Sequence, residues 1–489
     1  MKHFLKGFLL MAVSALIAIS CNDDGDRATI TFDTNSAYFA WGESQEVAFY
    51  ATHIKSYSVT TKPDGWADPV IDAENRILKI TAPAQEGDKV ETSGTIVLMG
   101  TSTEGKSVTA SLFVSISETV DFTAEPANSY LANKKQTHYL FDAMVKGEGQ
   151  GSLQTASVKI IWQSHSSVIQ HLRLHEGVAS FYVGKSSEGE IPKGNALLGA
   201  YDSKGKLLWS WHIWVADYDP QQAGATLSLN GYEMMGRNLG ALEHSNATSA
   251  DIFDSYGLYY QWGRKEPFIG PSTYQFSNGT SAAMYDDKGA RLMLLSETIT
   301  PTLGTMEYAT EHPLSFLVGV EESGYDWLWS GSNALWGEEK GLNDPCPRGW
   351  KVAPAAAFAG LSIKEPLTGV ESLIYYDKYG WPLTDGNAES LFMAGGRRIY
   401  PHTDEEQSNG GKFQNIYINP DEERTPLMRN EALYNQPWVG LYWTSDSQQR
   451  DASAFYFIYN KAKLENSRVE GIVPHYRANG MLVRCVADR

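Results

Sequence analysis

The sequence predicts a multidomain, mostly β protein in which two antiparallel β-sandwiches precede a loop-rich C-terminal domain. The chain has 489 residues, which is too long for a single core. Short runs with period-two alternation fill its first half, and this alternation is typical of antiparallel strands. After Pro220 glycines become frequent and tryptophans occur in loop-like contexts. Apolar residues make up 42% and charged residues 20%, a composition that excludes a disordered chain.

The N-terminus carries a predicted export signal at residues 1–20. Lys2 and Lys6 precede an apolar run, Phe8–Ile19, which is too short to span a hydrocarbon core of about 30 Å. Small residues directly before Cys21 resemble a bacterial lipoprotein signal. The resemblance implies that Cys21 is lipidated and becomes the first residue, and plain secretion is the alternative.

Residues 21–27 form a predicted acidic tether. The run Asn22-Asp23-Asp24-Gly25-Asp26 resembles the surface-export signal of Bacteroidetes lipoproteins. That resemblance implies a protein that is lipid-anchored in the outer membrane and faces the cell exterior. No later segment is long and apolar enough to cross a membrane, so we expect the lipid to be the contact with the membrane.

The net charge of −18, from 40 basic and 58 acidic residues, makes nucleic acid an unfavourable partner. No basic cluster interrupts this acidic balance. The charge favours solubility and does not identify a ligand.

Residues 28–118 are predicted to form an immunoglobulin-like β-sandwich. Alternating runs such as 28–32 and 77–80 lead to a hairpin of 94–99 and 108–116. The segment loosely resembles the bacterial Ig-like spacer modules of surface lipoproteins. We therefore interpret it as a spacer, with ligand binding as the alternative.

Residues 119–222 are predicted to form a second β-sandwich. Its clearest strand is 207–215, in which His212 and Trp214 share one face. A histidine in this position is typical of a structural residue with satisfied hydrogen bonds and not of a metal ligand. The opposite face of the strand is the predicted core face and carries Trp209, Trp211, Ile213 and Val215.

Residues 343–352 contain a Pro-Cys-Pro corner that no helix can cross, because two prolines fix φ on both sides of Cys346. The alanine-rich stretch 354–361 behind it is predicted to be a short helix. Once Cys21 is lipidated, only Cys346 and Cys485 remain, and in an oxidising compartment we expect them to form a disulfide. Closing a loop of roughly 140 residues constrains the unfolded chain by at most about 4–5 kcal/mol.

Several ordered motifs surround these cysteines. They are Asp-Pro-Cys-Pro-x-Gly-Trp-x-Val at 344–352, Gly-x-Tyr-Trp-Thr-Ser at 440–445 and Val-Arg-Cys-Val at 483–486. In this order they resemble the Fibrobacter succinogenes major paralogous domain. Upstream blocks at 237–241 and 260–265 resemble the same module in Bacteroides surface and fimbria-associated lipoproteins. Ala353 and Met235-Gly236 depart from the pattern.

The resemblance covers about residues 225–489, and we assign 223–489 to this domain. It implies an α+β fold similar to C-type-lectin-like and formylglycine-generating-enzyme-like domains, in which paired chain ends close a loop-rich β core. The latter enzymes use reactive cysteines or copper, whereas both cysteines here are assigned to structure. The sequence also lacks a nucleophile elbow, a His-Glu-x-x-His pair and a phosphate loop. We therefore predict a protein that is not an enzyme and needs no cofactor.

The leading hypothesis is a surface adhesin that presents a binding domain for a glycan or a host or partner protein. Trp327 and Trp329 are candidate ligand-stacking residues. Asp286 and Asp287 are candidate ligand acids that would take calcium or act as paired carboxylates, with a solvated loop as the alternative. Asp421-Glu422-Glu423 is a similar acid run. A fimbrial tip or accessory subunit is the second hypothesis, and a glycan-active enzyme ranks last.

A further group of motif residues is predicted to stabilise the domain, since buried Arg and Asn side chains usually satisfy backbone carbonyls. A ligand-binding role is the alternative for them. These residues are Arg237, Asn238, Gln261, Trp262 and Arg264.

Overall fold

The structure is a computed structural model that describes residues 27–149, 151–272, 281–375, 377–398, 433–434, 439–448, 450–460 and 463–489. Cys21, the signal segment and the acid run 421–423 lie outside these ranges. The described chain is mostly β and forms several sheets. It divides into two compact units, Met1–Ser117 and Glu118–Arg489.

The first unit is a sandwich of two four-stranded sheets, with strand orders β1-β3-β6-β5 and β2-β8-β7-β4. β2 runs parallel to β8, and the other neighbours are antiparallel. Alternate residues of β7 are buried, as expected for a strand with one face on the core. The strands are β1 (Thr29–Phe32), β2 (Ser36–Phe39), β3 (Ser44–Thr52), β4 (Ile54–Thr61), β5 (Val70–Asp72), β6 (Ile77–Thr81), β7 (Ser93–Ser102) and β8 (Ser107–Ile116).

A tryptophan anchors the core of this first sandwich. The ring of Trp66 packs edge-on against Phe39 at 5.3 Å, and its indole N–H donates to the carbonyl of Glu91 at 2.8 Å. The buried indole therefore contributes its large apolar surface and also satisfies its only polar group.

The second unit begins with another sandwich, whose two sheets have the orders β13-β14-β11-β9 and β10-β16-β15-β12-β20-β21. The last two strands of the second sheet, β20 (Met284–Tyr285) and β21 (Arg291–Leu292), come from much later in the chain. The sandwich thus includes a hairpin from the predicted C-terminal domain. Its other strands are β9 (Glu118–Asp121), β10 (Ser129–Ala132), β11 (Thr137–Asp142), β12 (Ser157–Gln163), β13 (Gln170–His175), β14 (Val178–Val183), β15 (Gly194–Tyr201) and β16 (Leu207–Val215).

Strand β16 lies between two cores. The predicted core face is confirmed, because its four apolar residues all lie in the core of the sandwich. On the opposite face Trp214 belongs to the core of the C-terminal part. His212 is 1% exposed and its ring nitrogens contact Ser129 Oγ at 3.0 Å and Asn195 Oδ1 at 2.8 Å. Burial lowers the pKa of His212 to about 3. The prediction of a structural histidine with satisfied hydrogen bonds is confirmed.

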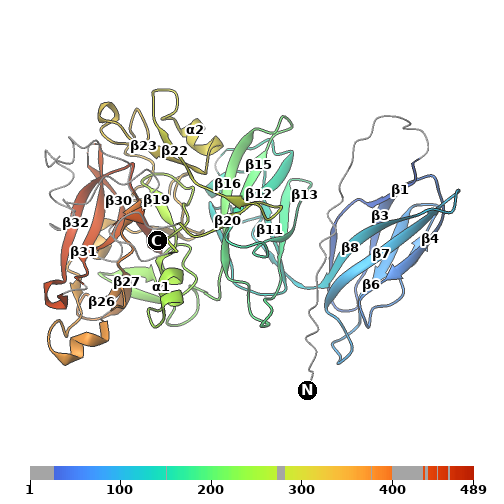
Figure 1. The fold of residues 1–489 in the computed structure, drawn as a ribbon, viewed down its shortest axis with the longest axis horizontal. Coiled ribbons are helices and arrows are strands. Elements are labelled where there is room, and N and C mark those ends of the chain that lie inside the picture. Colours follow the sequence, from blue (N-terminus) through green and yellow to red (C-terminus); the bar gives the residue numbers. More distant parts are fainter. Residues whose placement is uncertain are drawn as a thin grey trace, which may run out of the picture. The chain divides into compact units, whose positions relative to one another are not determined.

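The described residues of the C-terminal part of the second unit form four further sheets, visible from yellow-green to red in Figure 1. Their orders are β17-β18-β34-β24, β29-β28-β33-β30-β31-β32, β22-β23 and β25-β26-β27, and β19 joins the second of them by pairing with β33. The strands are β17 (Thr226–Leu229), β18 (Tyr232–Met235), β19 (Tyr259–Gln261), β22 (Leu295–Thr298), β23 (Ser315–Val318), β24 (Trp350–Val352), β25 (Ser362–Ile363), β26 (Gly380–Thr384), β27 (Glu389–Met393), β28 (Arg397–Arg398), β29 (Leu433–Tyr434), β30 (Val439–Gln448), β31 (Asp451–Ile458), β32 (Arg468–Tyr476), β33 (Gly480–Val483) and β34 (Cys485–Ala487).

In the described residues of this part, two short α-helices, α1 (Ser249–Tyr256) and α2 (Met306–Glu311), accompany these sheets. Thr248 caps α1, and Asp251 completes a capping box that satisfies the first free N–H groups. The helix predicted at 354–361 is wrong in type, because the segment is a 3-10 turn over Ala355–Phe358. Ala359 is already extended and Gly360 has a φ of +70°, so only one turn fits between Pro354 and the glycine.

The disulfide between Cys346 and Cys485 fixes the Pro-Cys-Pro corner to the last strand, with a Cα–Cα distance of 6.1 Å. The corner leads into β24, which is the antiparallel neighbour of β34, the strand that begins with Cys485. Asp344 supports the corner because its Oδ1 accepts the N–H of Cys346 and its Oδ2 accepts the N–H of Val352, both at 2.9 Å. The end of the chain is thereby held inside the sheet by covalent and polar contacts.

Side-chain N–H groups join the sandwich of the second unit to its C-terminal part. Asn128 Nδ2 donates to the carbonyls of Leu342 at 2.7 Å and Asp344 at 2.9 Å. Asn195 Nδ2 donates to the carbonyl of Gly240 at 2.9 Å, and the indole N–H of Trp214 donates to that of Ala241 at 2.9 Å. These contacts explain why residues 118–489 form one compact unit although the sequence predicts two domains there.

Candidate binding groove

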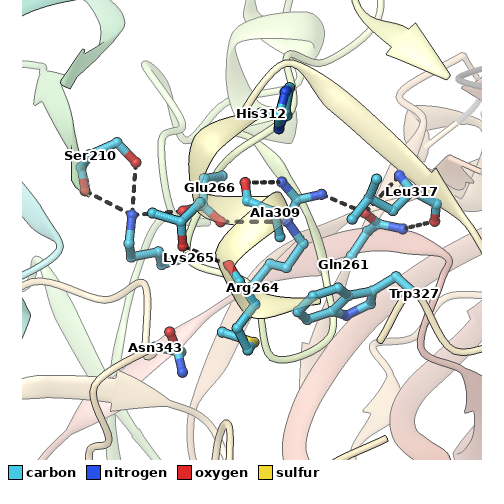
Figure 2. Close-up of polar contacts among 12 residues, drawn as sticks. Ser210, Gln261, Arg264, Lys265, Glu266, Ala309, His312, Leu317, Trp327 and Asn343 are labelled. Atoms are coloured by element: carbon cyan, nitrogen blue, oxygen red, sulfur yellow. Dashed lines mark hydrogen bonds and ion pairs between the residues drawn. The ribbon is translucent and has the colours of Figure 1, made fainter. Parts of the chain in front are cut away.

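A buried charged cluster marks the seam between the sandwich and the C-terminal part (Figure 2). It consists of Arg264, Lys265 and Glu266, none of which is more than 4% exposed. Arg264 donates to the carbonyls of Ser315 at 2.9 Å and Ala309 at 3.2 Å, and so connects β19, α2 and β23. Its guanidinium therefore has a structural role.

Lys265 extends the same cluster into the sandwich. Its ammonium donates to the carbonyl and hydroxyl oxygens of Ser210 at 3.0 and 2.7 Å and lies 4.1 Å from the centre of the Trp209 ring. It also pairs with Glu266 at 2.7 Å. Burial acts to raise the pKa of Glu266, but the adjacent Lys265 and Arg264 outweigh it and hold that pKa below its usual value. Both cations of the triad thus contact the same buried carboxylate, and the triad is a structural element.

Two hollows open to the surface beside this cluster, and together we call them the seam groove. One has a volume of about 610 Å³ and the other about 470 Å³. Both lie between the β15–β16 turn, at residues 201–208, and the segment 306–315, which contains α2. Helix α2 packs beside β16 in Figure 1, so the groove follows a contact between elements that are far apart in sequence.

Lys206 separates the two hollows. Its ammonium lies 2.7 Å from Glu307 and 2.7 Å from Glu311, which are one helical turn apart on α2. The hydrogen bond from Lys206 lowers the pKa of Glu307. Because its carboxylate is held ionised by a lysine, Glu307 is unsuited to the general-acid role that glycoside hydrolysis needs.

The larger hollow combines aromatic, polar and apolar side chains. Tyr201 and His312 line it, together with Lys204 and the apolar Leu295, which is 56% exposed. The His312 ring stacks on Tyr308 at 3.9 Å, and its Nδ1 lies 3.0 Å from the Tyr308 carbonyl. The groove can therefore offer ring faces, hydrogen-bonding groups and apolar contacts to one ligand.

Trp327 was predicted to stack on a ligand, and this prediction is wrong. Its side chain is 0% exposed and its indole N–H donates to the carbonyl of Trp262 at 2.7 Å. Arg264 lies 5.6 Å from the Trp327 ring. The loop folds inward because burying a large aromatic surface stabilises it more than exposure does. Trp329 is partly buried against the same core and does not line the seam groove.

The predicted ligand acids Asp286 and Asp287 lie in the turn between β20 and β21. Asp286 Oδ1 accepts the N–H groups of Lys288 at 2.9 Å and Ala290 at 2.7 Å, so this carboxylate shapes the turn. Asp287 is exposed and close to Tyr201, whose pKa is raised by burial and by this carboxylate. Across the described parts of the chain, no group of three or more His, Cys, Asp or Glu side chains is arranged to hold a metal ion.

The motif residues that we expected to stabilise the domain make structural contacts. Gln261 Nε2 donates to the carbonyls of Leu317 and Ala478, both at 2.7 Å. Asn238 donates to the carbonyl of Tyr256 at 3.0 Å and accepts from Arg484 Nε at 3.0 Å. The remaining contacts are those of Arg237 with Asp217 and Leu242, of Trp262 with Thr444, and of Arg264 with Ser315 and Ala309.

Sequence reasoning did not find the residues of the seam groove. Tyr201, Lys206, Leu295 and His312 belong to no motif and are spread over more than 100 positions of the chain. The sequence indicates only that Lys204-Gly205-Lys206 forms a turn between two strands, and this does not point to a binding site. The groove arises from packing, and no local pattern encodes it.

Comparisons with known proteins identify no family. No family model matches the chain, and no curated protein matches it. Among solved structures it is similar to SGBP-B of the mixed-linkage glucan utilization locus of Bacteroides ovatus, in complex with a mixed-linkage heptasaccharide, at 12% identity and a TM-score of 0.12. That match covers 36% of this chain and 42% of the other. The titin fragment I67–I69 matches at 15% identity and a TM-score of 0.13, over 39% of this chain and 66% of the other.

The D00-D0 domain of intimin matches at 10% identity and a TM-score of 0.13, over 38% of this chain and 96% of that one. The chain thus spans less than two thirds of the first two of these structures. At these TM-scores the likenesses carry no argument about function. Within the described residues, no helix is long and apolar enough to cross a membrane.

Proposed function

We propose that this protein is a non-catalytic, lipid-anchored surface protein whose second unit binds a glycan in the seam groove. The observation that carries the proposal is the pair of adjoining open hollows with mixed lining. Each has a volume within the range of about 300–1,000 Å³ that is usual for ligand sites. Tyr201 offers a ring face, while Lys204, Glu311 and His312 offer donors and acceptors for hydroxyl groups.

Binding is favoured over catalysis because the charged groups of the groove are paired with one another. Lys206 forms ion pairs with both Glu307 and Glu311, and no nucleophile with an adjacent base lines either hollow among the described residues. A glycan-active enzyme would need one carboxylic acid with a raised pKa facing the ligand. The groove offers a surface for recognition instead.

The test is a glycan-array screen of the purified chain from residue 22, followed by calorimetry with any glycan that binds. Leu295→Arg places a charge on an exposed lining residue and should weaken binding by about tenfold or more, that is by about 1.4 kcal/mol. Met293→Arg is the matched control, since Met293 is 78% exposed, two residues away and outside the lining. Equal affinity of the two variants would exclude the groove as the site.

The lipid anchor and the outward location form the second part of the proposal. They rest on the signal segment, Cys21 and the acidic tether of the sequence. Replacing Cys21 by Ala should move the protein from the membrane fraction to the soluble fraction. Unchanged fractionation would disprove lipidation at this position.

A fimbrial tip or accessory subunit, as in the module of fimbria-associated lipoproteins that the C-terminal motifs resemble, is the second candidate. It is favoured by an exposed apolar segment near the β25–β26 connection. Val370, Leu373 and Ile374 are 83%, 60% and 63% exposed. Such clusters mark protein contacts. Leu373→Asp together with Ile374→Asp should abolish co-sedimentation with filaments, and full retention would reject this role.

A further inference from the structure

A second charged cluster lies beneath the Pro-Cys-Pro corner and is separate from the seam groove. Lys340 Nζ is 2.8 Å from Asp344 Oδ1 and 3.6 Å from Glu148 Oε1. The side chains of Lys340 and Asp344 are 3% and 2% exposed, and that of Glu148 is 15% exposed. Glu148 belongs to the sandwich, whereas the other two belong to the C-terminal part.

The carboxyl group of Glu148 is held in an environment that disfavours its charged form. Its Oε1 is buried and, among the described residues, has no hydrogen-bond partner. Burial raises the pKa of Glu148, and the nearby Lys340 and Arg348 offset this only in part. A buried carboxyl group with a raised pKa beside a lysine is suited to accept and return a proton.

We propose that Lys340 and Asp344 form an intramolecular amide bond, with Glu148 as the group that transfers the protons. The reactants already touch at 2.8 Å, so no conformational change is needed to bring nitrogen and carboxyl group together. Both charges of the pair are nearly withdrawn from water, and this costs free energy that the neutral amide avoids.

The reaction is balanced without any further reagent. The ammonium of Lys340 loses a proton to Glu148, which passes it to Oδ1 of Asp344, and the free amine then attacks Cγ of the neutral carboxyl group to form the Nζ–Cγ bond. The Cγ–Oδ1 bond then breaks, and Oδ1 leaves as water with two protons that originate from the ammonium. Glu148 ends in the protonation state in which it began.

The backbone is arranged to support this step. The N–H of Val352 contacts Oδ2 at 2.9 Å, and Oδ2 carries the negative charge of the tetrahedral intermediate and then becomes the amide oxygen. The N–H of Cys346 contacts the leaving oxygen Oδ1 at 2.9 Å. Lys340 Nζ also donates to the Cys346 carbonyl at 2.8 Å, which orients the nitrogen.

The test is a tryptic digest of the reduced and alkylated full-length protein, read by mass spectrometry. Cleavage after Lys340 should be lost, and the peptide 292–348 should be lighter than its sequence mass by one water. Fragment ions between Lys340 and Asp344 should be missing from its spectrum. A cyclic imide at Asp344 would also cost one water, but its formation needs the backbone N–H of the next residue. That residue is Pro345, which has no N–H, so an imide does not account for the loss of water.

The chain offers a matched control within the same digest. Lys351 Nζ lies 2.9 Å from Asp488 Oδ1, but these side chains are 13% and 32% exposed. Cleavage after Lys351 should be complete. In Glu148→Gln, which keeps the side-chain volume but cannot transfer a proton, the peptide 341–348 should reappear at full mass.

Two results would overturn the proposal. One is wild-type protein in which trypsin cleaves after Lys340 as completely as after Lys351. The other is a water loss that persists in Glu148→Gln, because the carboxyl group then has no part in the reaction.

Discussion

The pairing of Asp326 with Arg477 makes stability depend on pH through one buried carboxyl group. Both side chains are 1% exposed, with Oδ2 of Asp326 3.4 Å from the guanidinium. Burial raises the pKa of Asp326 to about 6, even though the N–H of Leu328 and the charge of Arg477 act in the opposite direction. The ion pair therefore does not fully compensate for the loss of water.

The sign of the pH dependence follows from this shift. The unfolded chain has the ordinary pKa of 3.8, so between about pH 4 and pH 6 the folded state binds more protons. Stability due to this group therefore rises as pH falls through 6 and levels off below 4. Asp326→Asn should lack this rise in stability. As pH falls from 7 to 4, the free energy of unfolding of the wild type should therefore increase by about 1–3 kcal/mol relative to that of the variant.

Urea unfolding followed at several pH values measures this difference. Asp287→Asn is the control because Asp287 is exposed, and it should follow the wild-type profile. A constant gap between wild type and Asp326→Asn from pH 7 to pH 4 would show that the carboxyl group does not titrate in this range.

Single residues also show what the sequence could and could not predict. The period-two pattern of β16 correctly separated its two faces, because strand geometry alone decides which residues share a side. Trp327 was placed wrongly because its short loop has no period, so nothing local indicates whether the ring faces the core or the solvent. The structural motif residues, by contrast, lie where buried polar groups are needed.

At the scale of elements, the disulfide should be the largest single contribution to the stability of the C-terminal sheet. It closes a loop with a sequence separation of 139. The chain-entropy model gives about 5 kcal/mol at most for a loop of this length. The free energy of unfolding of the double variant Cys346→Ala and Cys485→Ala should therefore be lower than that of the wild type by up to this amount. Both cysteines are also buried in the core.

Chemical denaturation with and without reductant measures the effect. Reduction should lower the midpoint of the wild type to that of the double variant and leave the double variant unchanged. A thiol assay in denaturant should find no free thiol at these two positions in the oxidised wild type. If reduction leaves the wild-type midpoint unchanged, the cysteines are not bonded or the bond does not contribute.

Elements with strong local patterns were predicted better than those that depend on distant partners. The strand at 207–215 and the Pro-Cys-Pro corner follow from alternation and from fixed φ angles. The pairing of β12 with β20, which adds a C-terminal hairpin to the sandwich, has no local signal. A pairing between strands so far apart in sequence depends on the whole fold.

At the scale of the whole molecule, the contacts predict two cooperative unfolding units and not three. Trp162, Leu197 and Trp214 of the sandwich lie in the core of the C-terminal part. Lys265 in turn relies on Ser210 of the sandwich for two of its hydrogen bonds. Separating residues 118–222 from 223–489 would expose the apolar side chains of Trp162, Leu197 and Trp214. It would also remove the Ser210 oxygens that accept the hydrogen bonds of the buried Lys265.

Calorimetry of the full chain should therefore show two transitions, one of which is reproduced by a fragment of residues 27–117. A fragment of 118–489 should melt at the temperature of the other transition. A fragment of 223–489 should be insoluble or melt at a clearly lower temperature, because it lacks part of its own core. Three separate transitions, or a 223–489 fragment as stable as 118–489, would show that the sandwich and the C-terminal part fold independently and that the seam groove is a contact between separable domains.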